Sequence, residues 1–433
     1  MAYFEFDNTH SKFCFRHIVL QPTTLCNLDC DYCYLTDRHE PNKMSVGVAE
    51  AVVASIKDAP HPITILWHGG EPLACGIEHF RKLVEPFEQL RLAGKINHNI
   101  QINGTMISPD WCRLFREKGF RVGLSIDGPE GCNVNRVNRA NMPAWDRIMK
   151  GVGLLKINRI PFGIIAVVSE ANIDCAEPLY EFFSSLGCRS VCVNIVESEG
   201  LNKEKNHLRE KDVRRFWSEL FDEWRANPVI RIREFDNALG WLKRVSDDFE
   251  QHEYFARDLW PTIAWNGDVL MLSPEFLSIP QEKRDEFVTG NILNKPLTEI
   301  VEDSFSAKYV KDYFAGIKKC ASECMYFSYC GGGQASNKYF ELNQINATET
   351  EECRNTRKLL VNTVAGAFTS GKLDSIDAAK SASVNLNKLI CSLPENMQPR
   401  NYSCFDRHQP EAVLTADEDS TQVDWSDWSD KES

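Results

Sequence analysis

Three cysteines stand close together near the start of the chain. Cys26, Cys30 and Cys33 are spaced as Cys-x3-Cys-x2-Cys and follow the apolar run 18–20. Thiolates this close, in a loop that leaves a strand, can bind three irons of one 4Fe–4S cluster and leave the fourth iron open to a substrate or cofactor. A zinc site is the alternative. Zinc favours four ligands, however, and the nearest later candidate for a fourth is His39.

The cysteine motif is followed by an aromatic residue, Tyr34, and so resembles the signature of the radical S-adenosylmethionine (SAM) enzymes. The resemblance implies that the open iron chelates the amino and carboxylate groups of SAM. An electron from the cluster then cleaves SAM to a 5′-deoxyadenosyl radical, which abstracts a hydrogen atom. The expected partners therefore include an electron donor such as flavodoxin or ferredoxin.

A second motif, Gly69-Gly70-Glu71-Pro72, follows the next apolar run. Adjacent glycines allow positive φ and let the backbone approach a ligand closely. A carboxylate beside them can accept hydrogen bonds from an ammonium group. In the radical SAM enzymes such a segment holds the methionine end of SAM, so the resemblance implies SAM binding at these four residues.

Short polar side chains mark the ends of the third and fourth predicted strands. Asn103, Ser125 and Asp127 are suited to bind a ribose or a carboxylate, although Asn-Gly and Asp-Gly-Pro are also strong turn formers. In the polar loop that follows, we expect Arg136 or Arg139 to hold the SAM carboxylate, and Arg136 is our choice. The alternative is two solvated surface arginines. The sequence identifies no catalytic acid or base.

Two acidic residues lie just beyond the sixth predicted strand. Glu197 and Glu199 follow the run that ends at Asn194-Ile195. From the sequence they could face the site or lie on the surface of a loop.

A second group of cysteines lies in a Gly-rich region near the C-terminus. Cys320, Cys324 and Cys330 precede three consecutive glycines, and Cys353 follows. Four cysteines fit a second, fully ligated 4Fe–4S cluster, with zinc bound by four thiolates as the alternative. Beside a radical SAM motif, this region resembles the SPASM domain, an auxiliary-cluster module of enzymes that modify ribosomal peptides.

The region also departs from a full SPASM domain, which carries two auxiliary clusters. Residues 265–268 resemble its opening hairpin, but Ser273 and Pro274 follow where a cysteine is expected. Gln334 stands where another cysteine would follow Cys330. We therefore expect one auxiliary cluster, held by the four cysteines named above.

Further segments resemble the cyclophane-forming GRRM-type peptide maturases. They are Ser273-Pro274-Glu275, Gly290-Asn291-Ile292, Gly331-Gly332-Gly333, Ser336-Asn337-Lys338-Tyr339 and Thr348-Glu349-Thr350. The resemblance implies that the radical takes a hydrogen from the β-carbon of a residue in a ribosomally made peptide. That carbon then bonds to a nearby aromatic ring, with a net loss of two hydrogens. One alternative is formylglycine formation, as in the anaerobic sulfatase-maturating enzymes. The other is a non-catalytic metal-cysteine protein.

The elements that must position these motifs alternate along the chain. Strands are predicted over 17–20, 62–67, 96–102, 121–126, 162–168 and 189–195. Helices are predicted over 46–56, 77–92, 109–118, 145–156 and 174–186. Apolar strands that alternate with helices predict a parallel sheet covered on both faces. Six such units predict an α/β fold, a partial (β/α)6 TIM-like barrel with its chemistry at the carboxyl ends of the strands.

The predicted domains follow from this pattern. Residues 1–200 form the radical SAM partial barrel, 201–258 a bridge with helices over 213–225 and 235–249 and a junction at 231–235, and 259–371 the SPASM-like domain. Residues 372–433 are a helix and an acidic tail that ends in Trp425-Ser426-Asp427-Trp428-Ser429-Asp430. Acidic tails are usually solvated and disordered. Three-residue cyclophane enzymes join an aromatic residue to the residue two positions on, so the tail is also a candidate substrate segment.

Composition limits the classes of partner. The 433 residues are 43% hydrophobic and 26% charged, which is ordinary for a globular protein. A net charge of -13 argues against nucleic acid as the main partner. No apolar run is long enough to span a membrane, and no signal peptide is recognisable. Sixteen cysteines without a secretory signal indicate a reducing compartment, hence the cytoplasm.

Overall fold

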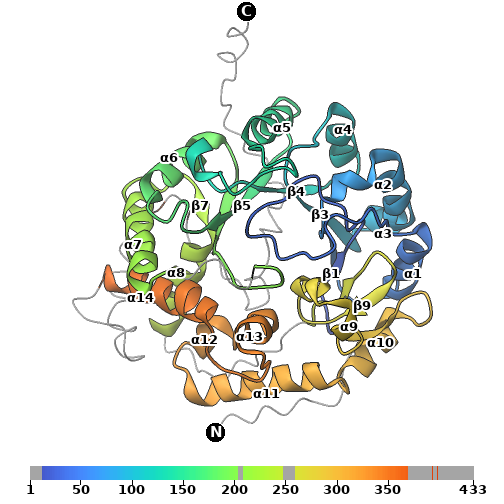
Figure 1. Cartoon of the computed structure of the whole chain (residues 1–433). Helices are drawn as coiled ribbons and strands as arrows, with labels where there is room; N and C mark the ends of the chain where they lie inside the picture. Colours follow the sequence, from blue (N-terminus) through green and yellow to red (C-terminus); the bar gives the residue numbers. More distant parts are fainter. Residues whose placement is uncertain (1–11, 203–207, 247–258, 369–392, 394–396, 398–433) are drawn as a thin grey trace, which may run out of the picture.

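The protein folds around a parallel sheet that curves into an incomplete barrel (Figure 1). The computed structural model describes residues 12–202, 208–246 and 259–368 and positions 393 and 397. Within them, one sheet has the strand order β10-β9-β8-β1-β2-β3-β4-β5-β6-β7. Its parallel strands are β1 (His17–Leu20), β2 (Ile63–Trp67), β3 (Ile96–Ile102), β4 (Arg121–Ser125), β5 (Phe162–Val168), β6 (Ser190–Ile195) and β7 (Arg231–Ile232). The predicted α/β fold with a parallel sheet is confirmed.

Helices lie outside the strands and cover them (Figure 1). They are α1 (Val46–Ile56), α2 (Ile77–Val84), α3 (Glu88–Leu92), α4 (Pro109–Glu117), α5 (Trp145–Ile157), α6 (Ala176–Leu186), α7 (Glu210–Ala226) and α8 (Arg233–Ser246). The single helix predicted over 77–92 is wrong. It is interrupted by a 3-10 turn, Glu85–Phe87, that contains Pro86. Proline has no backbone N–H and clashes with the preceding turn, so a regular helix does not continue through it.

The predicted bridge continues the alternation of strands and helices. The stretch 231–235, predicted as a junction, contains β7, which pairs in parallel with β6 through Ser190↔Arg231 and Val191↔Ile232. Helix α7 packs against α6, and α8 packs against β6 and β7. A strand of two residues has too little periodicity to be recognised in a sequence, so only the helices on either side of it were predicted.

The C-terminal part begins with an antiparallel hairpin on the edge of the same sheet. Strand β8 (Thr262–Ile263) pairs in parallel with β1 and antiparallel with β9 (Asp268–Leu270), which pairs with β10 (Val288–Asn291). Gly267 adopts φ +92° in the turn between β8 and β9. Residues 265–268 therefore form a hairpin turn, as their sequence predicted.

The remaining helices extend from this hairpin around the open side of the barrel (Figure 1). They are α9 (Gln281–Arg284), α10 (Leu297–Ser304), α11 (Lys308–Glu323), α12 (Phe327–Cys330), α13 (Ala335–Leu342) and α14 (Leu359–Gly366). Helix α10 packs against α1, and α14 packs against α7 and α8. The C-terminal part therefore joins the first and last units of the barrel and closes the ring. The predicted tail, 372–433, lies outside the described residues apart from positions 393 and 397.

Candidate functional site

Cys26, Cys30 and Cys33 lie in a long loop, residues 21–44, between β1 and α1, which we call the cysteine loop. Backbone hydrogen bonds hold it from two sides. Cys26 N donates to Arg38 O at 2.8 Å within the loop, and Asp29 N donates to Val137 O at 2.8 Å in the loop after β4. The thiols are therefore positioned by ordinary backbone bonding.

The three thiols of this loop are partly buried neighbours. Burial, and then the proximity of Glu71 and of the other two thiols, raises the pKa of Cys26. Burial likewise raises the pKa of Cys30 to about 12 and that of Cys33 above its usual value. Leu28 N donates to Cys26 Sγ at 3.4 Å. A metal must displace the thiol protons on binding, and N–H···S bonds of this kind stabilise cluster thiolates.

The donor set fits an iron–sulfur cluster. Within the described residues, no three His, Cys, Asp or Glu side chains converge as ligands of a single metal ion would. A 4Fe–4S cluster takes each cysteine on a different iron, so three neighbouring thiols are a suitable set. Cys26, Cys30 and Cys33 are the residues that would hold it.

The glycine motif packs directly on the cysteine loop. Gly69 and Gly70 follow β2 with φ +93° and +66°. A Cβ on Gly70 would lie 2.6 Å from Thr23 O, 2.7 Å from Thr24 O and 2.8 Å from Leu25 O. Glycine is therefore required here because two backbones touch.

Glu71 fixes the relation between three elements at this end of the sheet. Its carboxylate accepts hydrogen bonds from Leu73 N at 3.0 Å and from Asn103 N, beyond β3, at 2.7 Å. Its own N–H donates to Leu25 O at 2.8 Å. The side chain is 1% exposed, and burial raises its pKa to about 7. Pro72 follows as the first residue of a buried 3-10 turn.

Asn103 lies against the first cysteine. Its Nδ2 donates to Asn27 Oδ1 at 2.9 Å and is 3.9 Å from Cys26 Sγ, and its Oδ1 accepts from Thr105 Oγ1 at 2.7 Å. Asn27 donates in turn to Thr105 Oγ1 at 2.7 Å. Sequence reasoning missed Asn27 and Thr105, although both stand inside or beside recognised motifs. Binding of SAM by Asn103 stays a prediction.

Ser125 ends β4 and accepts a hydrogen bond from Gln101 Nε2 on β3 at 2.9 Å. It is only partly buried, so its hydroxyl remains accessible at the carboxyl end of the strand. Its predicted contact with SAM also stays a prediction.

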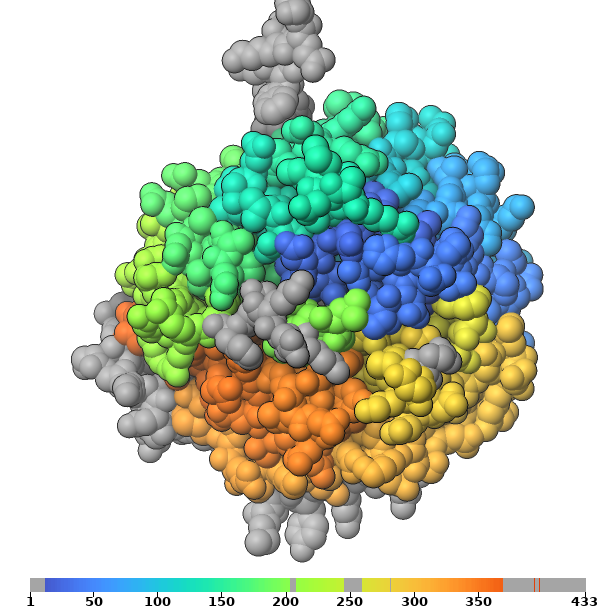
Figure 2. All heavy atoms as spheres, viewed as in Figure 1, coloured from blue at the N-terminus to red at the C-terminus, as the bar shows by residue number. Residues whose placement is uncertain are grey.

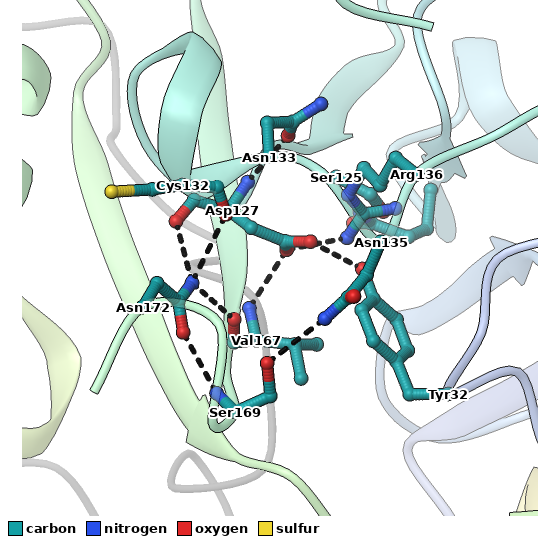
Figure 3. Close-up of polar contacts among 11 residues, drawn as sticks. Tyr32, Ser125, Asp127, Cys132, Asn133, Asn135, Arg136, Val167, Ser169 and Asn172 are labelled. Atoms are coloured by element: carbon teal, nitrogen blue, oxygen red, sulfur yellow. Dashed lines mark hydrogen bonds and ion pairs between the residues drawn. The ribbon is translucent and has the colours of Figure 1, made fainter. Parts of the chain in front are cut away.

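Asp127 and Arg136 form a buried ion pair, with Arg136 NH2 2.8 Å from Asp127 Oδ1 (Figure 3). Asp127 is 1% exposed and Arg136 5%. Tyr32, between Cys30 and Cys33, donates to Asp127 Oδ2 at 2.5 Å, and Val167 N donates to Oδ1 at 2.9 Å. The Asp127 carboxylate is thus engaged by three donors of the protein.

Arg136 lies close to the cysteine loop. Its guanidinium is 5.5 Å from the centroid of the Tyr32 ring, and its positive charge is close enough to Cys30 to oppose the rise in that thiol's pKa. Arg139 is exposed and donates to Cys26 O at 3.1 Å. The sequence left open whether Arg136 and Arg139 bind SAM or are solvated surface residues. Because Arg136 is buried, it is not a solvated surface arginine. Its predicted contact with SAM stays a prediction.

The acidic residues after β6 face the interior. Glu199 is 4% exposed, and Asn337 Nδ2 on α13 donates to Glu197 at 2.6 Å. Leu201 N donates to Tyr34 O at 3.2 Å, so this segment touches the cysteine loop next to Cys33. Of the two alternatives left open by the sequence, the structure shows the interior position.

Tyr34 and His68 form a partly buried pair beside this segment. Tyr34 Oη is 3.1 Å from His68 Nε2. Burial lowers the pKa of His68 to about 4, so the imidazole is neutral at pH 7. Burial, and then nearby carboxylates, raises the pKa of Tyr34. His68 gave no signal in the sequence beyond its place before Gly69.

The C-terminal cysteines come from α11, α12 and the turn before α14. Cys324 directly follows the last residue of α11, Cys330 ends α12, and Cys353 begins a π-helical turn, Cys353–Lys358. Burial, and then the proximity of Cys330, raises the pKa of Cys353, with Cys324 adding to the effect. Cys320 Sγ lies 3.4 Å from Thr348 O. Gly332 N donates to Cys330 Sγ at 3.4 Å, so this thiol also has an N–H donor beside it.

Comparison with known proteins places these features in a family. The model of the radical SAM superfamily matches residues 20–183, which span β1 to α6. An uncharacterized protein of Synechocystis, sll1766, is 31% identical over 367 residues, which cover 81% of this chain and 91% of that protein. A serine-type anaerobic sulfatase-maturating enzyme of Bacteroides thetaiotaomicron is 25% identical over 353 residues, covering 75% and 83% of the two chains.

Solved structures share the fold. A structure of anSMEcpe with bound AdoMet and the Kp18Cys peptide superposes with a TM-score of 0.65 at 23% identity and covers 81% of this chain and 97% of that chain. SuiB of Streptococcus suis bound to the precursor peptide SuiA gives 0.59 at 20% identity, covering 78% and 76%. At this level of identity, the two matches establish a common architecture for the barrel and the C-terminal part.

The buried ion pair gives a stability prediction. We expect Asp127→Asn to lower the free energy of unfolding by about 3–5 kcal/mol, because it leaves the Arg136 charge buried without its partner. Asp110→Asn breaks an exposed ion pair with Arg113 and should cost less than about 1 kcal/mol. Denaturant unfolding of the two variants measures both values, and equal losses would show that the buried pair carries no special weight.

Gly70→Ala gives a second prediction. We expect this change to prevent stable packing of the cysteine loop, because the new Cβ would collide with three carbonyl oxygens. The positive φ adds backbone strain, which alone costs about 1–3 kcal/mol. Gly94→Ala is the matched control, since Gly94 has φ +67° and nothing within 4 Å of its Cβ position. Melting temperature and iron uptake should fall much further in Gly70→Ala, and similar losses in both variants would contradict the close contact.

Proposed function

The chain belongs to the radical SAM superfamily, and we propose that it modifies a ribosomally made peptide, by joining an aromatic ring to the β-carbon of a nearby residue. It is a radical SAM enzyme, whose cofactors are a 4Fe–4S cluster and SAM. When bound, this pair supplies a hydrogen-abstracting radical. The comparisons with sulfatase-maturating enzymes and with SuiB support a peptide or protein as the substrate.

One structural observation supports a peptide-modifying function most directly. A single polar segment, 197–202, lies between the two cysteine groups. On one side Leu201 N bonds to Tyr34 O, next to Cys33. On the other side the charge of Glu352, next to Cys353, is close enough to Glu197 to raise the pKa of Glu197, after the larger effect of burial. A substrate bound here would lie beside both cysteine groups.

The protein's own residues have defined tasks in this proposal. Cys26, Cys30 and Cys33 hold the first cluster, and Gly69, Gly70, Asn103 and Ser125 line the carboxyl ends of β2 to β4 where SAM is expected. Asp127 and Arg136 hold the cysteine loop in place through the hydrogen bond from Tyr32 to Asp127. Glu71, Pro72, Asp127 and Arg136 are further proposed contacts of SAM.

The second cysteine group is proposed to hold one auxiliary 4Fe–4S cluster. Cys324, Cys330 and Cys353 are electrostatic neighbours, and Cys320 lies close to the same glycine turn at Gly332. Such a cluster offers a place for the electron that remains after a carbon–carbon bond forms. An external donor such as flavodoxin or ferredoxin supplies the electron that starts the reaction.

Formylglycine formation is the second candidate, because curated sulfatase-maturating enzymes match most of this chain. The two reactions leave different products. Crosslinking needs an aromatic ring and no hydroxyl or thiol, whereas formylglycine formation consumes a Cys or Ser side chain and produces an aldehyde. A peptide without Ser or Cys therefore separates them.

Metal content tests the two cysteine groups. We expect about eight irons per chain in anaerobically prepared protein and about four when Cys26, Cys30 and Cys33 are all changed to Ala. The same preparation is assayed for zinc and sulfide. About four irons in the wild type and none in the variant, with zinc in both, would make the C-terminal group a zinc site.

The reaction is tested with a Ser- and Cys-free peptide that contains Trp-Ala-Lys, under reduction and with SAM. We expect 5′-deoxyadenosine release and a peptide lighter by two hydrogens, and neither with the triple cysteine variant. A hydrazine-reactive product from a Ser or Cys peptide, with the Trp peptide unchanged, would favour formylglycine formation. The intact mass of the enzyme reports in the same run whether its own Trp425 or Trp428 is modified.

A further inference from the structure

Three carboxylates gather near the cysteine loop. Glu197 and Glu199 follow β6, and Glu275 lies on the 3-10 turn Pro274–Ser278, and we call these three residues the acidic cluster. They lie close together, since Glu197 and Glu275 both raise the pKa of Glu199 after the larger effect of burial, and Glu275 also raises the pKa of Glu197. Figure 2 shows the segment around residue 200 between the cysteine loop and the C-terminal part.

The acidic cluster lacks a matching cation in the described part of the chain. No Lys or Arg forms an ion pair with any of its three carboxylates there. The guanidinium of Arg357, which lies close enough to lower the pKa of Glu197 slightly, is paired with Glu352 at 3.0 Å. Buried carboxylates without a counter-charge are costly, and burial raises the pKa of Glu197 to about 8 and that of Glu199 well above its usual value, so without a cation these groups hold protons at pH 7. A cation from outside would displace these protons and pair with the carboxylates.

Hydrogen bonding gives a second, independent indication. Asn337 Oδ1, Asn202 Oδ1 and Glu199 Oε1 have no partner in the described structure, and the three residues are 0%, 3% and 4% exposed. Asn337 and Asn202 adjoin Glu197, because their Nδ2 atoms donate to its carboxylate at 2.6 Å and its carbonyl at 2.7 Å. The two amide oxygens are acceptors, and so is Glu199 Oε1 once its carboxyl is ionised, so a donor of several hydrogen bonds would satisfy all three.

The acidic cluster is partly exposed. Glu197, Glu275 and Tyr34 are only partly buried, whereas Glu199 and Asn337 lie deeper. Tyr34 adjoins Cys33, and its phenol is close enough to all three carboxylates for them to raise its pKa after burial. A group that enters here would come to rest beside the first cysteine group.

We propose that the acidic cluster binds the ammonium or guanidinium group of a Lys or Arg side chain in the substrate peptide, next to the residue that is modified. A lysine ammonium offers three donors and an arginine guanidinium five, which suits the three unpartnered acceptors. This inference rests on the proposed function. It also disfavours the chain's own tail as a substrate, because Asp427 and Asp430 would bring negative charge to carboxylates.

The subsite is tested without chemistry, on the full-length, anaerobically prepared protein. The probe is n-butylammonium chloride, which reproduces the end of a lysine side chain. Sodium chloride at equal ionic strength controls for screening, and n-butanol controls for the apolar tail. We expect a concentration-dependent rise in melting temperature with n-butylammonium alone, because a ligand that binds only the folded state stabilises it.

Variants assign the effect to the acidic cluster. In Glu199→Gln the apparent affinity for n-butylammonium should fall by about tenfold, and Glu275→Gln serves as the second variant. Glu78→Gln, at an exposed position on α2, should respond like the wild type. Equal responses to n-butylammonium and sodium in the wild type, or an unchanged affinity in both cluster variants, would overturn the proposal.

A peptide pair separates this inference from the proposed reaction. With wild-type enzyme we expect the Trp-Ala-Lys peptide to be modified with a kcat/KM about tenfold above that of the Trp-Ala-Gln peptide, and this preference should shrink in Glu199→Gln. Selective n-butylammonium binding with neither peptide modified would leave the subsite standing and count against the reaction. Modification of both peptides at equal rates would uphold the reaction and overturn the subsite.

Discussion

The carboxylate of Asp127 brings together parts of the chain that must not move relative to one another. The guanidinium of Arg136, the phenol of Tyr32 and the backbone N–H of Val167 all donate to it where water is excluded. Because Tyr32 stands inside the cysteine motif, the loop that bears the thiols is fixed to β4 and β5 through this one group. A low-dielectric environment strengthens each bond and makes the loss of any partner costly.

Much of the fold follows from local pattern in the sequence. Six apolar runs alternate with amphipathic stretches, and each became a strand or helix near its predicted bounds. The differences have physical causes. Pro86 breaks a helix whose apolar face continues on both sides of it, and β7 is two residues long, so only pairing with β6 makes it a strand.

The site was predictable where function depends on residue type and spacing, and much less where it depends on tertiary contact. Cysteines spaced for a cluster and paired glycines are visible in one dimension. The ion pair between Asp127 and Arg136 is not visible in the sequence, because each residue alone is equally typical of a turn or of the surface. The sequence could not decide whether Glu197 and Glu199 face the interior or the surface. The contact that decides it comes from Asn337 on α13, more than a hundred residues later.

The acidic cluster exists only because the C-terminal part closes the ring. Its carboxylates come from the end of β6 and from the turn after β9, and Asn337 comes from α13, so no single unit of the barrel could form it. Bringing like charges together during folding reduces stability, and proteins retain such an arrangement mainly where binding repays it. The same closure brings Glu352, next to Cys353, close to Glu197, so the acidic cluster and the second cysteine group depend on the same tertiary contacts.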